Sequence, residues 1–243
     1  MSEETPPKEN AIYLGLTQTF PCSYLENQKE QLLTLTDTVV ESALYERMLG
    51  LGFRRSGNAI YKPHCPNCSA CQSIRIPAAD FKPSRRQKRT SKQNQKFSWH
   101  HSTEVKTNYY PLYEKYINER HRDGSMYPAS TEQFEQFLLC DWLPDNYIEI
   151  YDNQKLIGVA VIDLLDKSVS AIYSFFDPDY HKHSLGSYMI LLTIELAKQL
   201  NRDYVYLGYQ INDCRKMNYK TKYQPYQLLT DAGWLIQEEL SSS

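Results

Sequence analysis

The sequence contains no apolar run long enough to cross a bilayer. Its longest apolar patches, such as "MILLTIEL", are far shorter than the roughly 20 residues that a spanning helix needs. The first ten residues, "MSEETPPKEN", have neither a basic start nor an apolar stretch, so they do not read as a secretory signal. These absences predict a cytoplasmic protein that has no membrane partner.

The chain also lacks a strong net charge, since 27 basic residues face 29 acidic ones. This balance alone points to no partner, but it hides a segregated segment. Residues 82–96 hold seven basic residues and no acidic one, which leaves 20 basic and 29 acidic residues elsewhere. The segment reads either as a solvated face or as a groove for a nucleic-acid backbone. The candidates for contacting that backbone are Arg85, Arg86, Lys88, Arg89 and Lys92.

No repeat or low-complexity tract divides the 243 residues, a length that suits one large domain or two small ones. We expect a boundary near residue 105, between a small cysteine-containing α/β domain (1–105) and a larger α+β domain (106–243). Thr36 or Asp37 is expected to cap a helix within 36–53. The pattern also predicts strands at 59–63, 72–77 and 204–211, helices at 109–121 and 131–139, three strands within 147–178, and a helix beginning at Ser184 or Gly186.

The junction between the third of those strands and the following helix is a candidate phosphate seat. Unpaired N–H groups at a helix N-terminus attract anions, and basic side chains stand just ahead of them. The residues are His181, Lys182, His183, Ser184, Leu185, Gly186 and Ser187. The arrangement resembles the GCN5-related N-acetyltransferase fold, whose loop grips coenzyme A. Here Ser184 stands where that loop has glycine, which argues against coenzyme A; an ordinary helix cap is the simpler interpretation.

Five segments together resemble the arginyl-tRNA–protein transferase family, and more closely its bacterial leucyl-transferring branch. They are "FPCSYL", "GFRRSGNAIYKPHCPNCSACQSIRIP", "YINERHRDGSMYPAS", "IYSFFDPDYHKHSLGSYMILLTIELAKQL" and "YVYLGYQINDCRKMNYKTKYQP", in order over residues 12–235. The resemblance implies transfer of an aminoacyl group from tRNA to the N-terminal amine of a protein that begins with Asp or Glu. Such tagging directs proteins into N-degron proteolysis. The branch implies leucyl-tRNA as donor, with arginyl-tRNA as the alternative.

This reaction would need mostly positioning, because the tRNA ester is already reactive and the reference pKa of an α-amine is about 7.7–8.0. No Ser-His-Asp or Cys-His signature is present, and no cofactor is required for the chemistry. Tyr173 and Tyr209 are candidates for orienting amine and ester, although buried structural tyrosine is the alternative.

The acceptor's carboxylate should meet arginine or lysine. The candidates are Arg54, Arg55, Arg75, Arg120, Arg122, Arg215 and Lys216. We favour Arg120, Arg122 and Lys216, because they flank the expected catalytic domain; a surface or tRNA contact is the alternative for each.

Six cysteines are present, and Cys65, Cys68 and Cys71 stand at three-residue intervals. Eukaryotic members of the family carry four thiols that can hold an iron–sulfur cluster or zinc. The resemblance would make Cys22 the fourth ligand beside the local three, with a spacing closer to a ferredoxin-type run than to a zinc knuckle. The alternative is that these cysteines are reduced and only pack. Cys140 and Cys214 are expected to be unliganded.

Two other functions compete with aminoacyl transfer. A coenzyme A-dependent N-acetyltransferase would want glycine at position 184 and has no need of the basic segment at 82–96. A non-catalytic RNA-binding protein would have no need of a phosphate seat beside a strand meander.

Overall fold

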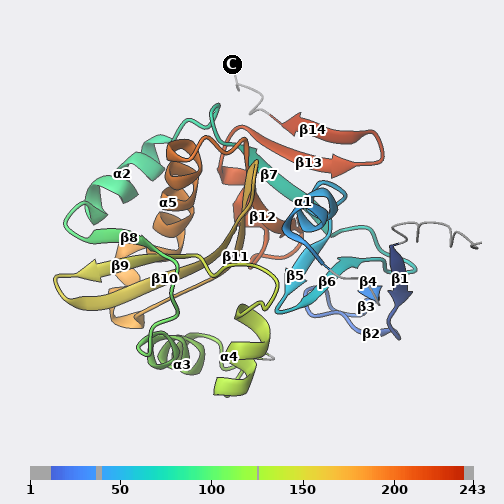
Figure 1. The fold of residues 1–243 in the computed structure, drawn as a ribbon, viewed down its shortest axis with the longest axis horizontal. Helices are drawn as coiled ribbons and strands as arrows, with labels where there is room; N and C mark the ends of the chain where they lie inside the picture. Colours follow the sequence, from blue (N-terminus) through green and yellow to red (C-terminus); the bar gives the residue numbers. More distant parts are fainter. Residues whose placement is uncertain (1–11, 37–39, 125, 238–243) are drawn as a thin grey trace, which may run out of the picture.

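The computed structural model describes residues 12–36, 40–124 and 126–237, which form a mixed α/β fold (Figure 1). Its centre is an eight-stranded sheet with the order β14-β13-β7-β12-β11-β10-β9-β8. The strands are β7 (Gln72–Pro77), β8 (Ser98–Ser102), β9 (Tyr147–Asp152), β10 (Lys155–Leu164), β11 (Ser168–Phe176), β12 (Tyr204–Gln210), β13 (Tyr226–Thr230) and β14 (Gly233–Gln237). All neighbours are antiparallel except β11 and β12, which run parallel.

Helices cover both faces of this sheet. α2 (Arg85–Asn94) and α5 (Leu185–Gln199) lie on one face, while α3 (Tyr109–Arg120) and α4 (Thr131–Leu138) lie on the other (Figure 1). Side chains of a strand alternate between faces, and β10 follows that rule. Ala160 and Ile162 belong to the core under α5, whereas Val159 and Val161 belong to the core under α3 and α4.

The N-terminal strands build a smaller sheet with the order β1-β4-β6-β5 and a separate pair, β2 with β3. The elements are β1 (Tyr13–Leu16), β2 (Phe20–Pro21), β3 (Lys29–Glu30), β4 (Leu32–Thr36), α1 (Ser42–Gly50), β5 (Arg54–Ser56) and β6 (Ala59–Pro63). A third core joins this part to the large sheet, since Tyr45, Met48 and Phe53 pack with Leu165 and Tyr206.

Most predicted elements are confirmed. The strands at 59–63 and 72–77 are β6 and β7, and the helix expected from Ser184 or Gly186 is α5, which begins at Leu185. The N-terminal helix starts later than expected, at Ser42, and its N-cap is Glu41. Thr36 instead ends β4, so its predicted capping role is wrong. Asp37, the other proposed cap, lies outside the described residues.

Two features were not anticipated. The basic segment forms helix α2, which Ser84 and Gln87 start through a reciprocal capping box. The last two described strands, β13 and β14, form a hairpin that was also not predicted.

The predicted domain boundary near residue 105 does not separate the two sheets, because β7 and β8 precede residue 105 and yet lie in the large sheet. The division of the chain into two domains therefore stays a prediction. No helix in the described ranges is long and apolar enough to span a membrane.

Candidate functional site

The two parallel strands at the centre of the large sheet separate soon after they meet. Pairing between β11 and β12 covers only Ser168 with Tyr204, Val169 with Val205 and Ser170 with Tyr206. Beyond this point, residues 171–174 of β11 are partly exposed, although the strand is central and buried at both ends. The carboxyl-terminal halves of β11 and β12 are therefore not paired with each other, and we call this unpaired region between the two strands the opening.

A bulge bends each strand that borders this opening. In β11, Ala171 and Tyr173 pair with successive residues of β10, which leaves Ile172 as the extra residue. In β12, the register against β7 shifts between Tyr206 and Tyr209. Gly208 sits within that shift at φ +83°, a conformation that favours glycine. Bulges re-aim side chains and end pairing, and they are frequent beside functional sites.

Two cationic side chains reach this opening from different parts of the chain. Arg54 of β5 is 5% exposed, and Lys220 of the 3₁₀ helix η2 (Asn218–Lys222) is 6% exposed. A Cβ at Gly208 would lie 3.9 Å from Arg54 Nε and 3.8 Å from Lys220 Nζ. Both groups therefore flank the same point of β12.

The hydrogen bonds of Arg54 are incomplete. Its Nη2 donates to the Ala171 carbonyl at 2.6 Å, on the other side of the opening. Its Nη1 is buried and donates to no described group. Buried polar atoms of this kind are rare and point to a missing partner.

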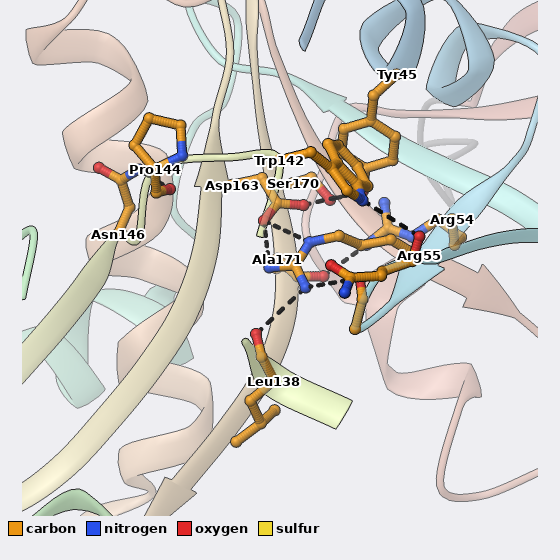
Figure 2. A network of polar contacts seen from close by, with 12 residues as sticks. Tyr45, Arg54, Arg55, Leu138, Trp142, Pro144, Asn146, Asp163, Ser170 and Ala171 are labelled. Atoms are coloured by element: carbon orange, nitrogen blue, oxygen red, sulfur yellow. Dashed lines mark hydrogen bonds and ion pairs between the residues drawn. The ribbon is translucent and has the colours of Figure 1, made fainter. Parts of the chain in front are cut away.

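The next residue is bound quite differently, as Figure 2 shows. Arg55 donates from Nε and Nη2 to Asp163 Oδ1 at 2.9 and 2.6 Å, and its Nη1 reaches the carbonyls of Gly57 and Leu138. Tyr45 donates to Asp163 Oδ2 at 2.9 Å. This network ties β5 and α1 to β10 and leaves no group free for a ligand, so its role is structural.

Lys220 lies in an environment that disfavours its charge. Burial, and then the nearby Arg54 guanidinium, lower the pKa of Lys220 to about 7. Its ammonium donates to the Tyr209 carbonyl, which fixes it at the end of β12. At neutral pH this side chain is thus divided between the protonated and the neutral form, and the neutral amine can accept a proton.

The predicted phosphate seat lies at the same end of β11. The chain passes from β11 through the 3₁₀ helix η1 (Pro178–His183) into α5, with Ser184 in the left-handed conformation between them. His181, Lys182, Ser184 and Ser187 are exposed, whereas Leu185 is buried. Gly186 contributes a partly exposed backbone, and His183 packs its ring 5.1 Å from that of Phe97. The first turn of α5 is thus open to solvent, as a phosphate seat requires.

The basic helix α2 lies directly beside that seat. Gln93 donates to the Lys182 carbonyl at 3.1 Å, and Asn94 donates to the His183 carbonyl at 2.9 Å. The five predicted residues are all exposed on α2: Arg85, Arg86, Lys88, Arg89 and Lys92. None of these five forms an ion pair with another described residue. Their contact with a nucleic-acid backbone stays a prediction, and the geometry leaves them free for it.

The two predicted catalytic tyrosines differ in their surroundings. Tyr209 is buried and donates to the Gly52 carbonyl at 2.9 Å, so its hydroxyl links β12 to the turn before β5. Tyr173 borders the opening, with its ring 5.3 Å from that of Phe137. Burial raises the pKa of both phenols. Each would therefore act as a hydrogen-bond donor and not as an anion, and its catalytic role stays a prediction.

The residues favoured for the acceptor carboxylate are all exposed. Lys216 pairs with Asp123 at 3.3 Å, and Arg122 donates from Nε to the Asn118 carbonyl. Arg120 lies 5.2 Å above the ring of Phe176, near the end of β11. Arg120 therefore lies at the carboxyl-terminal end of β11. Sequence reasoning included Arg54 in its wider set, but nothing in the letters indicated its burial or its unpaired nitrogen.

The four predicted metal ligands are all partly buried and carry free thiols. Burial, and then the nearby Cys65, Cys22 and Cys68, raise the pKa of Cys71 to about 12, which disfavours its thiolate. Across the described residues, no three His, Cys, Asp or Glu side chains are arranged to hold a metal ion. The donor set thus does not fit a metal in this arrangement, and the cluster or zinc stays a prediction.

A depression of about 510 Å³ lies elsewhere, at the edge of the large sheet beside β8 and β9. Its one deeply buried carboxylate, Glu149, already accepts hydrogen bonds from Lys106 and Tyr109 at 2.7 and 2.6 Å. The opening between β11 and β12 is the stronger candidate for the functional site, because the hydrogen bonding of Arg54 there is incomplete.

Comparison with known proteins assigns the family. The model of the arginine-tRNA-protein transferase N terminus matches residues 20–89, and that of the C terminus matches residues 108–230. An aspartate/glutamate leucyltransferase of Shewanella oneidensis is 56% identical over 223 residues, which cover 92% of this chain and 94% of that protein. One from Aeromonas hydrophila is 50% identical over 228 residues, covering 93% and 96%.

A solved structure, L-PGS from Bacillus licheniformis, aligns with a TM-score of 0.42 and 10% identity over 70% of this chain and 49% of that one, a likeness too low to support any argument. The family models and the relatives are decisive: the chain belongs to the arginine-tRNA-protein transferase family and is an aminoacyltransferase.

Proposed function

We propose that this protein transfers leucine from leucyl-tRNA to the N-terminal α-amine of proteins that begin with Asp or Glu. The observation that carries the proposal is the identity of 50–56%, over more than nine-tenths of the chain, with proteins named aspartate/glutamate leucyltransferase. Tagging of this kind would mark proteins for N-degron proteolysis in the cytoplasm. Arginyl transfer is the second candidate, because the matching family models are described by arginine.

The large sheet supports an acyltransferase architecture like that of the GCN5-related N-acetyltransferases. The features that support it are the parallel pair β11 and β12, the helix α5 that connects them, and the early separation of the two strands. In this arrangement the phosphates at the 3′ end of the tRNA would lie at the first turn of α5. The exposed face of α2 would contact the tRNA backbone next to it.

The reaction would take place in the opening between β11 and β12. The α-amine nitrogen forms a bond to the leucyl carbonyl carbon, the ester C–O bond breaks, and the ribose hydroxyl leaves with the proton that the amine gives up. Backbone and side-chain donors that border the opening would stabilise the developing oxyanion. Most of the rate enhancement would come from holding amine and ester in contact.

An incoming α-ammonium must lose a proton before it can attack. Lys220 is the group that we assign to accept it, since its pKa of about 7 leaves a large neutral fraction at physiological pH. Its position beside Gly208 puts it at the opening. A lysine with an ordinary pKa of about 10.4 would be almost fully protonated and could not serve as a base.

The direct test mixes the purified protein with labelled leucyl-tRNA or arginyl-tRNA and peptides that begin with Asp, Glu, Arg or Ala. We expect label from leucyl-tRNA on the Asp and Glu peptides only. Transfer from arginyl-tRNA would establish the second candidate. Acetylation of the peptides from acetyl-coenzyme A, without aminoacyl transfer, would refute both.

A further inference from the structure

Arg54 is a buried arginine without an anionic partner, and such a residue raises the free energy of the folded state. Its side chain is 5% exposed, yet no carboxylate among the described residues lies within ion-pairing distance. Unpaired burial of a charge carries a penalty of several kcal/mol. The neighbouring Arg55 shows that the fold can supply a partner, because Asp163 neutralises it.

Among the described residues no carboxylate pairs with Arg54, and Asp163, which accepts a hydrogen bond from Tyr45, is already paired with Arg55. Burial raises the pKa of Tyr45, Tyr61 and Tyr209 and keeps all three neutral, although the Arg54 guanidinium opposes this shift. Lys220 lies beside the same point of β12 and adds positive charge whenever it is protonated. The two cations together favour an anion at this point.

The guanidinium is also held in a fixed orientation. The bond from Nη2 to the Ala171 carbonyl fixes its plane across the opening, while the buried Nη1 has N–H groups without a described acceptor. A planar guanidinium with unpaired N–H groups on one edge suits a carboxylate, which can accept two parallel hydrogen bonds from it. A carboxylate bound at Nη1 would complete the hydrogen bonding of Arg54.

We propose that Arg54 binds the side-chain carboxylate of the acceptor's N-terminal Asp or Glu and so sets the acceptor specificity. The inference rests on the proposed function. In an Asp or Glu acceptor, the carboxylate and the α-amine belong to one residue, so the carboxylate site must adjoin the reacting carbon. The opening meets this requirement. The phosphates of the donor have other binding groups, namely α2 and the first turn of α5.

The test compares peptides that begin with Glu or Gln, which differ in charge but hardly in shape. For each enzyme variant, kcat/KM is measured with both peptides at saturating leucyl-tRNA. We expect Arg54→Gln to reduce kcat/KM for the Glu peptide about 10- to 100-fold, which is the strength of a charge-assisted pair. The value for the Gln peptide should change little, so the Glu/Gln ratio falls by the same factor.

Several controls separate this role from others. Arg47→Gln, on the exposed end of α1, should leave the ratio unchanged. Arg54→Lys keeps the positive charge but loses the planar guanidinium, so the Glu/Gln ratio of kcat/KM should fall about tenfold. If Arg54→Gln does not fold, Arg54→Lys tests the proposal. A ratio that survives both substitutions overturns the proposal. So does a raised KM for leucyl-tRNA with the ratio intact, which would make Arg54 a phosphate ligand of the donor.

A binding measurement separates failure of this inference from failure of the proposed function. Calorimetry without tRNA should give tighter binding of the Glu peptide than of the Gln peptide to the unmodified protein, and equal binding to Arg54→Gln. If no leucine is transferred but the Glu peptide still binds more tightly than the Gln peptide, the carboxylate site is supported and the proposed reaction is refuted. If leucine is transferred and Arg54→Gln binds the two peptides as the unmodified protein does, only the Arg54 inference falls.

Discussion

Two neighbouring regions of this molecule bury arginine in opposite ways. Where β5 meets β10, Arg55 is enclosed by Asp163, by backbone carbonyls and, through that carboxylate, by Tyr45. At the opening between β11 and β12, Arg54 has one backbone acceptor and an unpaired nitrogen. Burial is nearly equal, at 6% and 5% exposure. The comparison teaches that completeness of pairing, and not depth of burial, separates a structural charge from one kept for a ligand.

The largest effect is expected where pairing is complete. Arg55→Met should lower the free energy of unfolding by about 3–5 kcal/mol, because Asp163 would then be buried without its cation. Urea denaturation measures this loss, and Arg47→Met, at an exposed position, is the matched control. A loss below about 1 kcal/mol would mean that Asp163 finds another partner and that the Arg55 pair does not hold the fold.

Lys220 provides a pH-dependent form of the comparison. Its folded pKa of about 7 lies below the unfolded value, so the folded state is penalised fully below pH 7 and progressively less as pH rises toward about 10.5. Between pH 7 and pH 9, the protein should gain about 2 kcal/mol of stability relative to Lys220→Met. Urea denaturation at both pH values measures this change. A stability difference that does not vary with pH would show that Lys220 titrates normally.

The cations of α2 are a third case, because they are exposed and form no ion pair with another described residue. Reversing Arg86 and Arg89 to Glu should weaken tRNA binding about tenfold or more and flatten its salt dependence by roughly one to two units of slope. Filter binding over a range of salt concentrations measures both quantities. The control reverses Lys29 and Arg47, which are exposed on β3 and α1, away from α2 (Figure 1). An unchanged slope would make α2 only a solvated face.

The smallest effect is expected where pairing is incomplete. Arg54→Met should change the free energy of unfolding by less than about 1 kcal/mol, because the lost bond to Ala171 is offset by removal of an unpaired buried charge. The same urea measurement applies, with Arg55→Met as the contrast. A loss as large as that of Arg55→Met would show that Arg54 is structural, and the distinction between the two regions would disappear.

The sequence predicted the parts of the fold that have a regular apolar pattern. β6, β7 and the meander β9 to β11 are short runs rich in β-branched and aromatic residues, and α5 has a long apolar run. The helix α2 was not predicted, because it has no apolar stripe. It is held to the rest of the fold by polar side chains, Gln87 and Asn94, which donate hydrogen bonds to backbone carbonyls. The capping pair Ser84 and Gln87 was the signal that could have revealed it.

The site was predictable only in its outline. The first turn of α5 and the basic residues beside it are recognisable in the letters, because helix starts and charge runs are local features. The difference between Arg54 and Arg55 is not local. Neighbouring side chains on a strand point to opposite sides, and which of them meets a carboxylate depends on Asp163, more than a hundred residues away. The burial of Lys220 depends likewise on how η2 packs against β12.

The most direct test of the central claim is a crystal structure of the protein with a bound peptide that begins with Glu. We expect the glutamate carboxylate to lie within hydrogen-bond distance of Arg54 Nη1, with the α-amine in the opening between β11 and β12. A peptide whose carboxylate is held instead by Arg120, Arg122 or Lys216 on the surface, with Arg54 unchanged, would contradict it.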